Sequence, residues 1–210
     1  MMTTPQHEFA HYGLSQDLAL LYRTLPERRR LLRMLAVASG TGAVNVAAGV
    51  PLTISLQLKK SDQHCTSLAG YVVYVWHCDR DGNYSMYSRS VQNENYLRGV
   101  QVADKDSNLS FTTIFPGCYN GRYPHVHLEI FPSLDKAVSG SNMVKTSQLT
   151  FTESVFADVY ASPGYAGSLR NYAGTSLSRD MVFSDGASLQ IAATTGSVAA
   201  GYKAVLQVAI

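Results

Sequence analysis

The chain has 210 residues, of which 46% are hydrophobic and 15% are charged, and this globular composition excludes an intrinsically disordered protein. The net charge of +2 arises in residues 1–43, which carry five arginines and three acidic residues, while the rest of the chain carries twelve basic and twelve acidic side chains. A neutral body does not predict the basic surface that nucleic acid or an anionic membrane requires. The sequence has no run of about 18 uncharged apolar residues, so no membrane-spanning helix is predicted.

The N-terminal 48 residues resemble an export signal of the twin-arginine type. Residues 28–33 read Arg-Arg-Arg-Leu-Leu-Arg, and an uncharged stretch rich in small residues follows over 34–48. Within it, the run Val-Ala-Ala at 46–48 offers the small residues that a signal peptidase needs. The pattern predicts a signal over residues 1–48.

This interpretation divides the chain into the signal and one domain over residues 49–210, and it predicts a periplasmic or extracellular location. The alternative is an amphipathic helix from Ser15 to Ala38, supported by the leucines of this segment, which would cap the domain. Both interpretations are open at this point, because targeting segments resemble structural helices.

The body of the chain begins with short strands. Residues 51–58 alternate apolar and polar side chains, which predicts a strand with one buried face. Residues 70–77 are mostly β-branched or aromatic, as in a strand that is buried on both faces. Residues 109–115 and 125–131 alternate again and predict two more strands.

The C-terminal part continues this pattern. Residues 153–180 are less periodic and predict short helices or loops, whereas 188–193 and 202–209 flank Gly196 and Gly201 and predict a closing hairpin. Many short strands with turns between them predict an all-β protein, a β-sandwich of mixed or antiparallel strands behind the signal-like N-terminal segment.

The sharpest chemical feature is the run from residue 116 to 127, Pro-Gly-Cys-Tyr-Asn-Gly-Arg-Tyr-Pro-His-Val-His. His125 and His127 are two residues apart on a predicted strand, so both imidazoles project from one face and can reach one metal ion. Tyr119 lies in the turn just before this strand, and Arg122 brings a positive charge close to it. The histidine pair alone is a weak signal for a metal site, because alternating histidines also occur on solvated strands.

Further motifs between Val73 and Ile130 favour a metal site over a solvated strand. In chain order they read Val-Trp-His, Gly-x-Tyr-Ser with Tyr84, Leu-Arg followed by an aspartate, Phe-Thr-Thr-Ile-x-Pro-Gly-x-Tyr, and Arg-x-Pro-His-Val-His. In this order and spacing the region resembles the intradiol ring-cleavage dioxygenases, the family of catechol and protocatechuate dioxygenases. The resemblance is greatest to the exported single-domain members and, counting weaker similarity, covers residues 46–210.

The resemblance implies a non-haem Fe(III) site. Tyr84 matches the equatorial tyrosinate ligand, Tyr119 matches the axial tyrosinate that is released when substrate binds, and His125 and His127 match the two histidine ligands. Two phenolates suit a hard trivalent cation because their charge offsets that of the metal, which in turn keeps them deprotonated. The implied reaction uses O2 to cleave a catechol-like small molecule between its two hydroxylated carbons and yields a muconate-type diacid.

Two more side chains carry roles that the resemblance implies. Arg122 matches the arginine beside the substrate, where it would stabilise developing negative charge. Gln148 resembles the glutamine that lines the same pocket. The resemblance gives no particular diol as substrate and leaves the oligomeric state open.

Other reactive side chains near these motifs have simpler interpretations. His77 adjoins a tryptophan on a predicted buried strand and is predicted to be a hydrogen-bonded core residue rather than a fifth ligand. Cys78 and Cys118 either pair after export or remain buried thiols, and Cys65 would be left over.

The sequence departs from the family pattern before the first predicted strand. Family members usually have a Gly-Pro-aromatic turn that walls the active site, and no such segment precedes residues 49–52 here. A more open pocket, or loss of activity with the metal site intact, is therefore expected. Two alternatives follow: a non-catalytic exported binding module, and a copper or zinc binder that uses His125 and His127. The two tyrosines disfavour the second, since such metals rarely need two phenolates.

Overall fold

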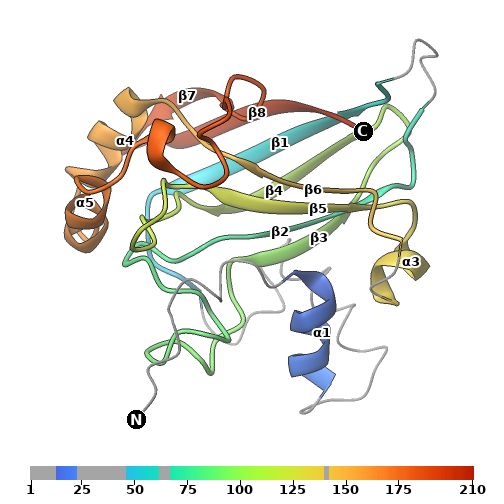
Figure 1. Cartoon of the computed structure of the whole chain (residues 1–210), viewed down its shortest axis with the longest axis horizontal. Helices are drawn as coiled ribbons and strands as arrows, with labels where there is room; N and C mark the ends of the chain where they lie inside the picture. Colours follow the sequence, from blue (N-terminus) through green and yellow to red (C-terminus); the bar gives the residue numbers. More distant parts are fainter. Residues whose placement is uncertain (1–12, 23–45, 62–66, 140–141) are drawn as a thin grey trace.

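The computed structural model describes residues 13–22, 46–61, 67–139 and 142–210, and all structural statements refer to these residues. Two four-stranded sheets dominate it (Figure 1). The first sheet has the strand order β4-β1-β8-β7, built from β4 (Asn108–Ile114), β1 (Pro51–Lys59), β8 (Gly201–Ala209) and β7 (Ala193–Ser197). In it β1 runs parallel to β8, and the other two pairs of neighbours are antiparallel.

The second sheet is antiparallel throughout, with the order β3-β2-β5-β6. Its strands are β3 (Arg98–Val102), β2 (Val72–Trp76), β5 (Val126–Phe131) and β6 (Lys145–Leu149). The helices are α1 (Leu14–Tyr22), α3 (Leu134–Val138), α4 (Glu153–Tyr160), α5 (Ala166–Tyr172) and a 3₁₀ helix (Leu177–Arg179). The two sheets confirm the predicted strand-rich fold of mixed strand direction.

The main core lies between the two sheets. On β1, alternate residues are buried, and four of them join this core: Leu52, Ile54, Leu56 and Leu58. The second sheet contributes six residues to it, Leu149 on β6 and five on β2 and β5: Val73, Val75, Val126, Leu128 and Ile130. Because side chains alternate along a strand, the residues between these five on β2 and β5 face away from the core. The site is built on that outer face.

The outer face of the second sheet is also covered. Val72, Tyr74 and Trp76 of β2 pack there in a separate cluster with Leu14 and Leu18 of α1. All five residues of β2 are therefore buried, as the predicted strand over 70–77 requires. In Figure 1 α1 lies along the lower side of β3 and β2, whereas α4 and α5 lie together at one end of the sheets.

Several sequence-based predictions need correction. The closing hairpin exists, but its first strand is β7 at 193–197, and residues 188–190 form a turn instead of a strand. The alternation of 188–193 was therefore misleading, and the Thr- and Ser-containing edge strand that follows has hardly any buried face to mark it. The strands β3 and β6 were not predicted. The short helices expected within 153–180 are confirmed as α4, α5 and the 3₁₀ helix.

The N-terminal segment is described only in part. Residues 14–22 form α1, which packs against the second sheet, while the rest of the alternative helix to Ala38 and the arginines of 28–33 lie outside the described residues. Within the described part of the chain, no helix has the length and apolarity to cross a bilayer.

Candidate active site

The register of the second sheet places four residues in one row. Arg98 of β3 lies opposite Trp76 of β2, Trp76 lies opposite His127 of β5, and His127 lies opposite Gln148 of β6. Directly paired residues project from the same face of a sheet. Since the neighbouring Val126 points into the main core, the whole row projects from the outer face.

Three potential metal-binding atoms converge at this row. Tyr84 Oη lies 3.2 Å from both His125 Nε2 and His127 Nε2, and the two nitrogens are 2.9 Å apart. Donor atoms that share one transition-metal ion at about 2.1 Å with angles near 90° lie about 3.0 Å apart. His125 Nδ1 contacts the backbone oxygen of Tyr123 at 2.6 Å, so Nδ1 carries the proton and Nε2 presents its lone pair. The geometry fits one shared ion.

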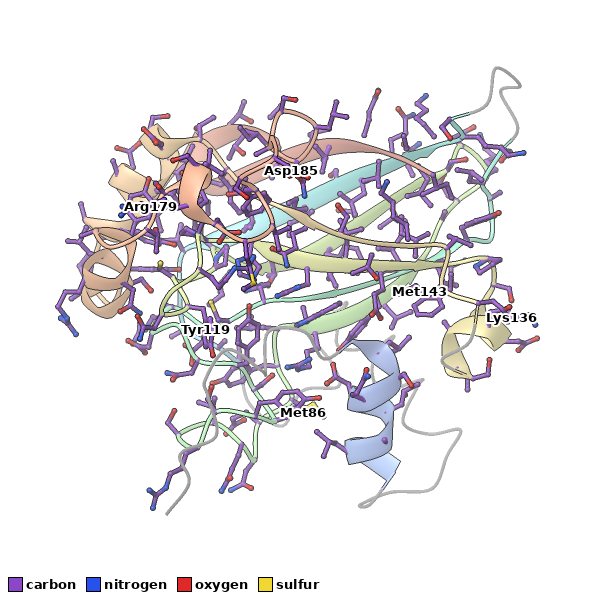
Figure 2. All side chains as sticks on the ribbon, viewed as in Figure 1. Met86, Tyr119, Lys136, Met143, Arg179 and Asp185 are labelled. Carbon is purple, nitrogen blue, oxygen red and sulfur yellow. The ribbon has the colours of Figure 1, made fainter. Side chains whose placement is uncertain are left out.

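Tyr119 is the fourth ligand that the sequence predicts. Its ring lies edge-on to the ring of Tyr84, with centroids 5.3 Å apart, and its buried hydroxyl has no hydrogen-bond partner among the described residues. Figure 2 shows Tyr119 beside the loops below the strands, on the same side as Met86. A buried hydroxyl without a partner is costly, and a metal ion held with Tyr84 would supply that partner.

Burial shifts the pKa values of these donors and so sets their charge. It lowers the pKa of His125 to about 3, with a further contribution from the positive charge of Arg122, so the imidazole is neutral. Burial also raises the pKa of Tyr84 and of Tyr119, against the opposing effect of Arg122. Without a cation both phenols stay protonated, and a bound trivalent cation would reverse that.

The donor set contains no carboxylate. Among the described residues no three or more His, Cys, Asp or Glu side chains gather into a metal-binding group. The candidate donor set thus consists of two imidazoles and two phenols, which differs from the two-histidine, one-carboxylate sites of Fe(II) oxygenases. Phenols instead fit a hard cation of high charge.

His127 is oriented by its neighbours in the row. The Trp76 ring stacks on its imidazole with centroids 4.5 Å apart and an interplanar angle of 4°. On the other side its Nδ1 contacts Gln148 Nε2 at 3.2 Å. Groups that fix the plane of a ligating imidazole tune its metal affinity. Gln148 therefore lies beside the candidate ligand His127.

Arg122 is held by a residue that the sequence did not reveal. Its Nε donates to Asp180 Oδ2 at 2.9 Å, and its Nη2 donates to Asp180 Oδ1 at 3.1 Å and to Gln148 Oε1 at 2.8 Å. Arg122 and Asp180 are both buried. Arg122 Nη1 is buried and has no hydrogen-bond partner among the described residues, so one charged donor remains available at the site.

The remaining reactive side chains lie outside the donor set. His77 Nδ1 contacts the backbone oxygen of Cys78 at 2.8 Å and its Nε2 contacts Thr113 Oγ1 at 2.7 Å, which confirms a hydrogen-bonded core histidine. Cys78 and Cys118 are buried free thiols rather than a disulfide. Burial raises the pKa of both, that of Cys118 to about 12, so neither is a reactive thiolate. Cys65 lies outside the described residues.

The chain is similar to known dioxygenases in sequence and in structure. A family model described as "Dioxygenase" matches residues 39–151, which include all four candidate ligands. An intradiol ring-cleavage dioxygenase from Tetranychus urticae is similar in structure, with a TM-score of 0.66 and 25% identity over 78% of this chain and 82% of that one. The dioxygenase domain of a carbohydrate-binding fusion from Streptomyces sp. SirexAA-E shares the fold, with a TM-score of 0.53 and 22% identity over 78% of this chain and 81% of that one.

A curated relative matches a shorter region. The chlorocatechol 1,2-dioxygenase of Rhodococcus opacus is 33% identical over 79 residues, which is 38% of this chain and 24% of that enzyme. The match thus spans about a quarter of the length of this relative.

Proposed function

Since the chain belongs to the family of intradiol ring-cleavage dioxygenases, we propose that it uses O2 to cleave a catechol-type ring between the two hydroxylated carbons, giving a muconate-type diacid. The cofactor would be Fe(III). Four side chains would hold it: Tyr84, Tyr119, His125 and His127. The observation that carries the proposal is the convergence of Tyr84 Oη and two imidazole Nε2 atoms within 3.2 Å of one another.

The residues of the site would have separate roles in metal binding, proton transfer and charge stabilisation. Bound iron would supply Lewis acidity toward an aromatic diol. His125 and His127 would bind as neutral imidazoles and Tyr84 as a phenolate. Tyr119 Oη, which makes no hydrogen bond in the described part of the chain, would accept and hold one hydroxyl proton of the diol. Arg122 Nη1 would donate to an oxygen that gains negative charge.

Burial supports the same proposal. The candidate ligands are at most 6% exposed, and Arg122 is 2% exposed. Electrostatic interactions are stronger in such a site than in water. A charged donor held by Asp180 before substrate arrives also costs no reorganisation during the reaction.

The visible spectrum of the iron-loaded protein tests the proposal. We expect a broad tyrosinate-to-iron absorption band that shifts to longer wavelength when catechol is added anaerobically. Admission of O2 should then give one O2 consumed per muconate formed. Tyr119→Phe should retain iron but lose part of the band and lower kcat by about 10²–10⁴-fold, if Tyr119 acts as a base. A colourless protein with confirmed iron loading would contradict the tyrosinate site and favour a binding module.

We also propose export through the twin-arginine-like segment, on the strength of the residues at 28–33. Replacing Arg28 and Arg29 by lysine should retain the chain in the cytoplasm, as measured by cell fractionation and immunoblotting. Equal export of the variant and the wild-type chain would rule this route out. Cleavage at 46–48 would remove α1 (Leu14–Tyr22), so the contacts of α1 described below belong to the uncleaved chain.

A further inference from the structure

The helix α1 packs into the outer face of the second sheet more closely than a surface helix would require. Leu14, Asp17 and Leu18 are all at most 4% exposed. The first turn of α1 is anchored from the sheet, because the backbone N–H of Leu14 donates to Glu129 Oε2 at 2.9 Å. Glu129 on β5 lies opposite Tyr74 on β2, one step along the sheet from the row that holds His127. The helix therefore lies next to the candidate metal site.

Asp17 is the polar centre of this contact. Its carboxylate accepts hydrogen bonds from Arg98 Nη1 and from the hydroxyls of Tyr74 and Tyr87. Arg98 is also buried, and its guanidinium carbon lies 5.1 Å from the centroid of the Tyr87 ring. A buried arginine needs a counter-charge. Among the described residues, Asp17 is the carboxylate that forms an ion pair with Arg98.

Arg98 links α1 to the segment 84–96 between β2 and β3, which is the loop that carries Tyr84. Its Nη2 donates to the backbone oxygen of Ser85 at 2.9 Å, and its Nε donates to Ser85 Oγ at 3.1 Å. Ser85 Oγ in turn donates to the backbone oxygen of Tyr96 at 2.7 Å, which joins the two ends of the loop. A continuous path of hydrogen bonds thus runs from Asp17 through Arg98 to the residue next to Tyr84.

We propose that α1 positions the loop that carries Tyr84, with Asp17 holding Arg98 and Arg98 holding Ser85. The significance of this loop as a ligand carrier rests on the proposed function, whereas the contacts themselves do not. A helix attached to the sheet on one side and to the ligand loop on the other restricts where Tyr84 Oη lies relative to His125 and His127. Asp17 is thus a positioning residue that touches neither substrate nor metal.

Hydrogen exchange on the metal-free, full-length chain tests the inference without requiring iron. In the wild type, the N–H groups of Tyr84, Met86 and Ser88 are bonded within the loop. Asp17→Asn removes the charge with little change of shape. We expect it to speed exchange in residues 84–91 by at least about tenfold, as loss of a hydrogen bond to a charged group implies.

Three further variants separate positioning from general loss of stability. Ser15→Ala changes an exposed residue of the same helix and should leave the loop unchanged. Phe151→Ala weakens the main core and should speed exchange across the sheets without singling out the loop. Ser85→Ala removes one of the two Arg98 contacts and should give a smaller loop-specific increase, and it serves also if Asp17→Asn fails to fold.

The outcomes show whether α1 positions the loop that carries Tyr84 or only covers the outer face of the second sheet. A selective increase in residues 84–91 for Asp17→Asn and Ser85→Ala supports the proposal. Faster exchange in α1 with an unchanged loop would overturn it, as would an unchanged loop in Ser85→Ala. In the iron-loaded protein, Asp17→Asn should also weaken iron binding by about 10–100-fold and alter the tyrosinate band. If the wild type binds no iron, the proposed function fails and the exchange result still stands by itself.

Discussion

Replacing His127 by alanine is expected to abolish iron binding and ring cleavage together. The change removes one of the three atoms that converge within 3.2 Å and leaves Trp76 and Gln148 with no imidazole to orient. Removing only a group that orients a ligand typically weakens metal binding by about 10–100-fold, so loss of the ligand itself should exceed about 100-fold. Iron bound per chain after dialysis measures the first effect, and O2 consumption with catechol measures the second.

A second buried histidine provides the matched control. His77 has both ring nitrogens bonded elsewhere, and burial lowers its pKa to about 4, so it is neutral as His125 is. His77→Gln should lower stability but leave the iron content of the folded protein unchanged. If His77→Gln lost iron while His127→Ala retained it, the metal centre would have to be placed elsewhere.

The sequence predicted the parts of the site that depend on local spacing or on motif. His125 and His127 share a face because they are two residues apart on one strand, and this spacing requires no tertiary information. Tyr84 and Tyr119 were identified only through motifs that resemble a known family. The structure places the Tyr84 hydroxyl within hydrogen-bonding distance of both imidazoles, although 41 residues separate it from His125.

The two aspartates that pair with buried arginines could not be predicted in this way. Asp180 lies 58 residues from Arg122, next to an irregular segment where an aspartate usually indicates an exposed turn. Asp17 lies in the segment that resembles an export signal, far from Arg98. A buried arginine requires a carboxylate, but this rule does not say which one. These partners meet only in the folded chain, where α1 packs against the second sheet and Asp180 follows the 3₁₀ helix.

Replacing Asp180 by alanine is expected to have the largest effect on stability. Arg122 and Asp180 have side chains that are 2% and 0% exposed, and the two are joined by two hydrogen bonds. Removing one partner of such a pair leaves a buried uncompensated charge and typically costs about 3–5 kcal/mol. The carboxylate also accepts the backbone N–H groups of Tyr123 and Val182, which would lose their partner. Urea unfolding at neutral pH measures this loss.

The pH dependence identifies the carboxylate as the cause. Burial by itself would raise the pKa of Asp180, but the hydrogen bonds from Arg122 and from the two backbone N–H groups outweigh it, so the pKa lies below its ordinary value. A group whose folded-state pKa is lowered contributes stability above its unfolded-state pKa of about 3.9 and loses it as the pH falls further. The stability difference between the wild type and Asp180→Asn should therefore be largest near neutral pH and shrink below about pH 4.

A double-mutant cycle then separates the pair from its role at the site. Arg122→Met and Asp180→Asn each leave one partner behind, whereas the double variant leaves no buried charge and should cost less than the sum of the two. An additive cycle would mean that the two side chains do not stabilise each other. The ranking of the variants by activity should differ from their ranking by stability, because only variants that keep Arg122 retain the free Nη1 donor. Asp180→Asn should thus keep part of the activity that Arg122→Met loses, since its amide oxygen can still accept one of the two arginine hydrogen bonds.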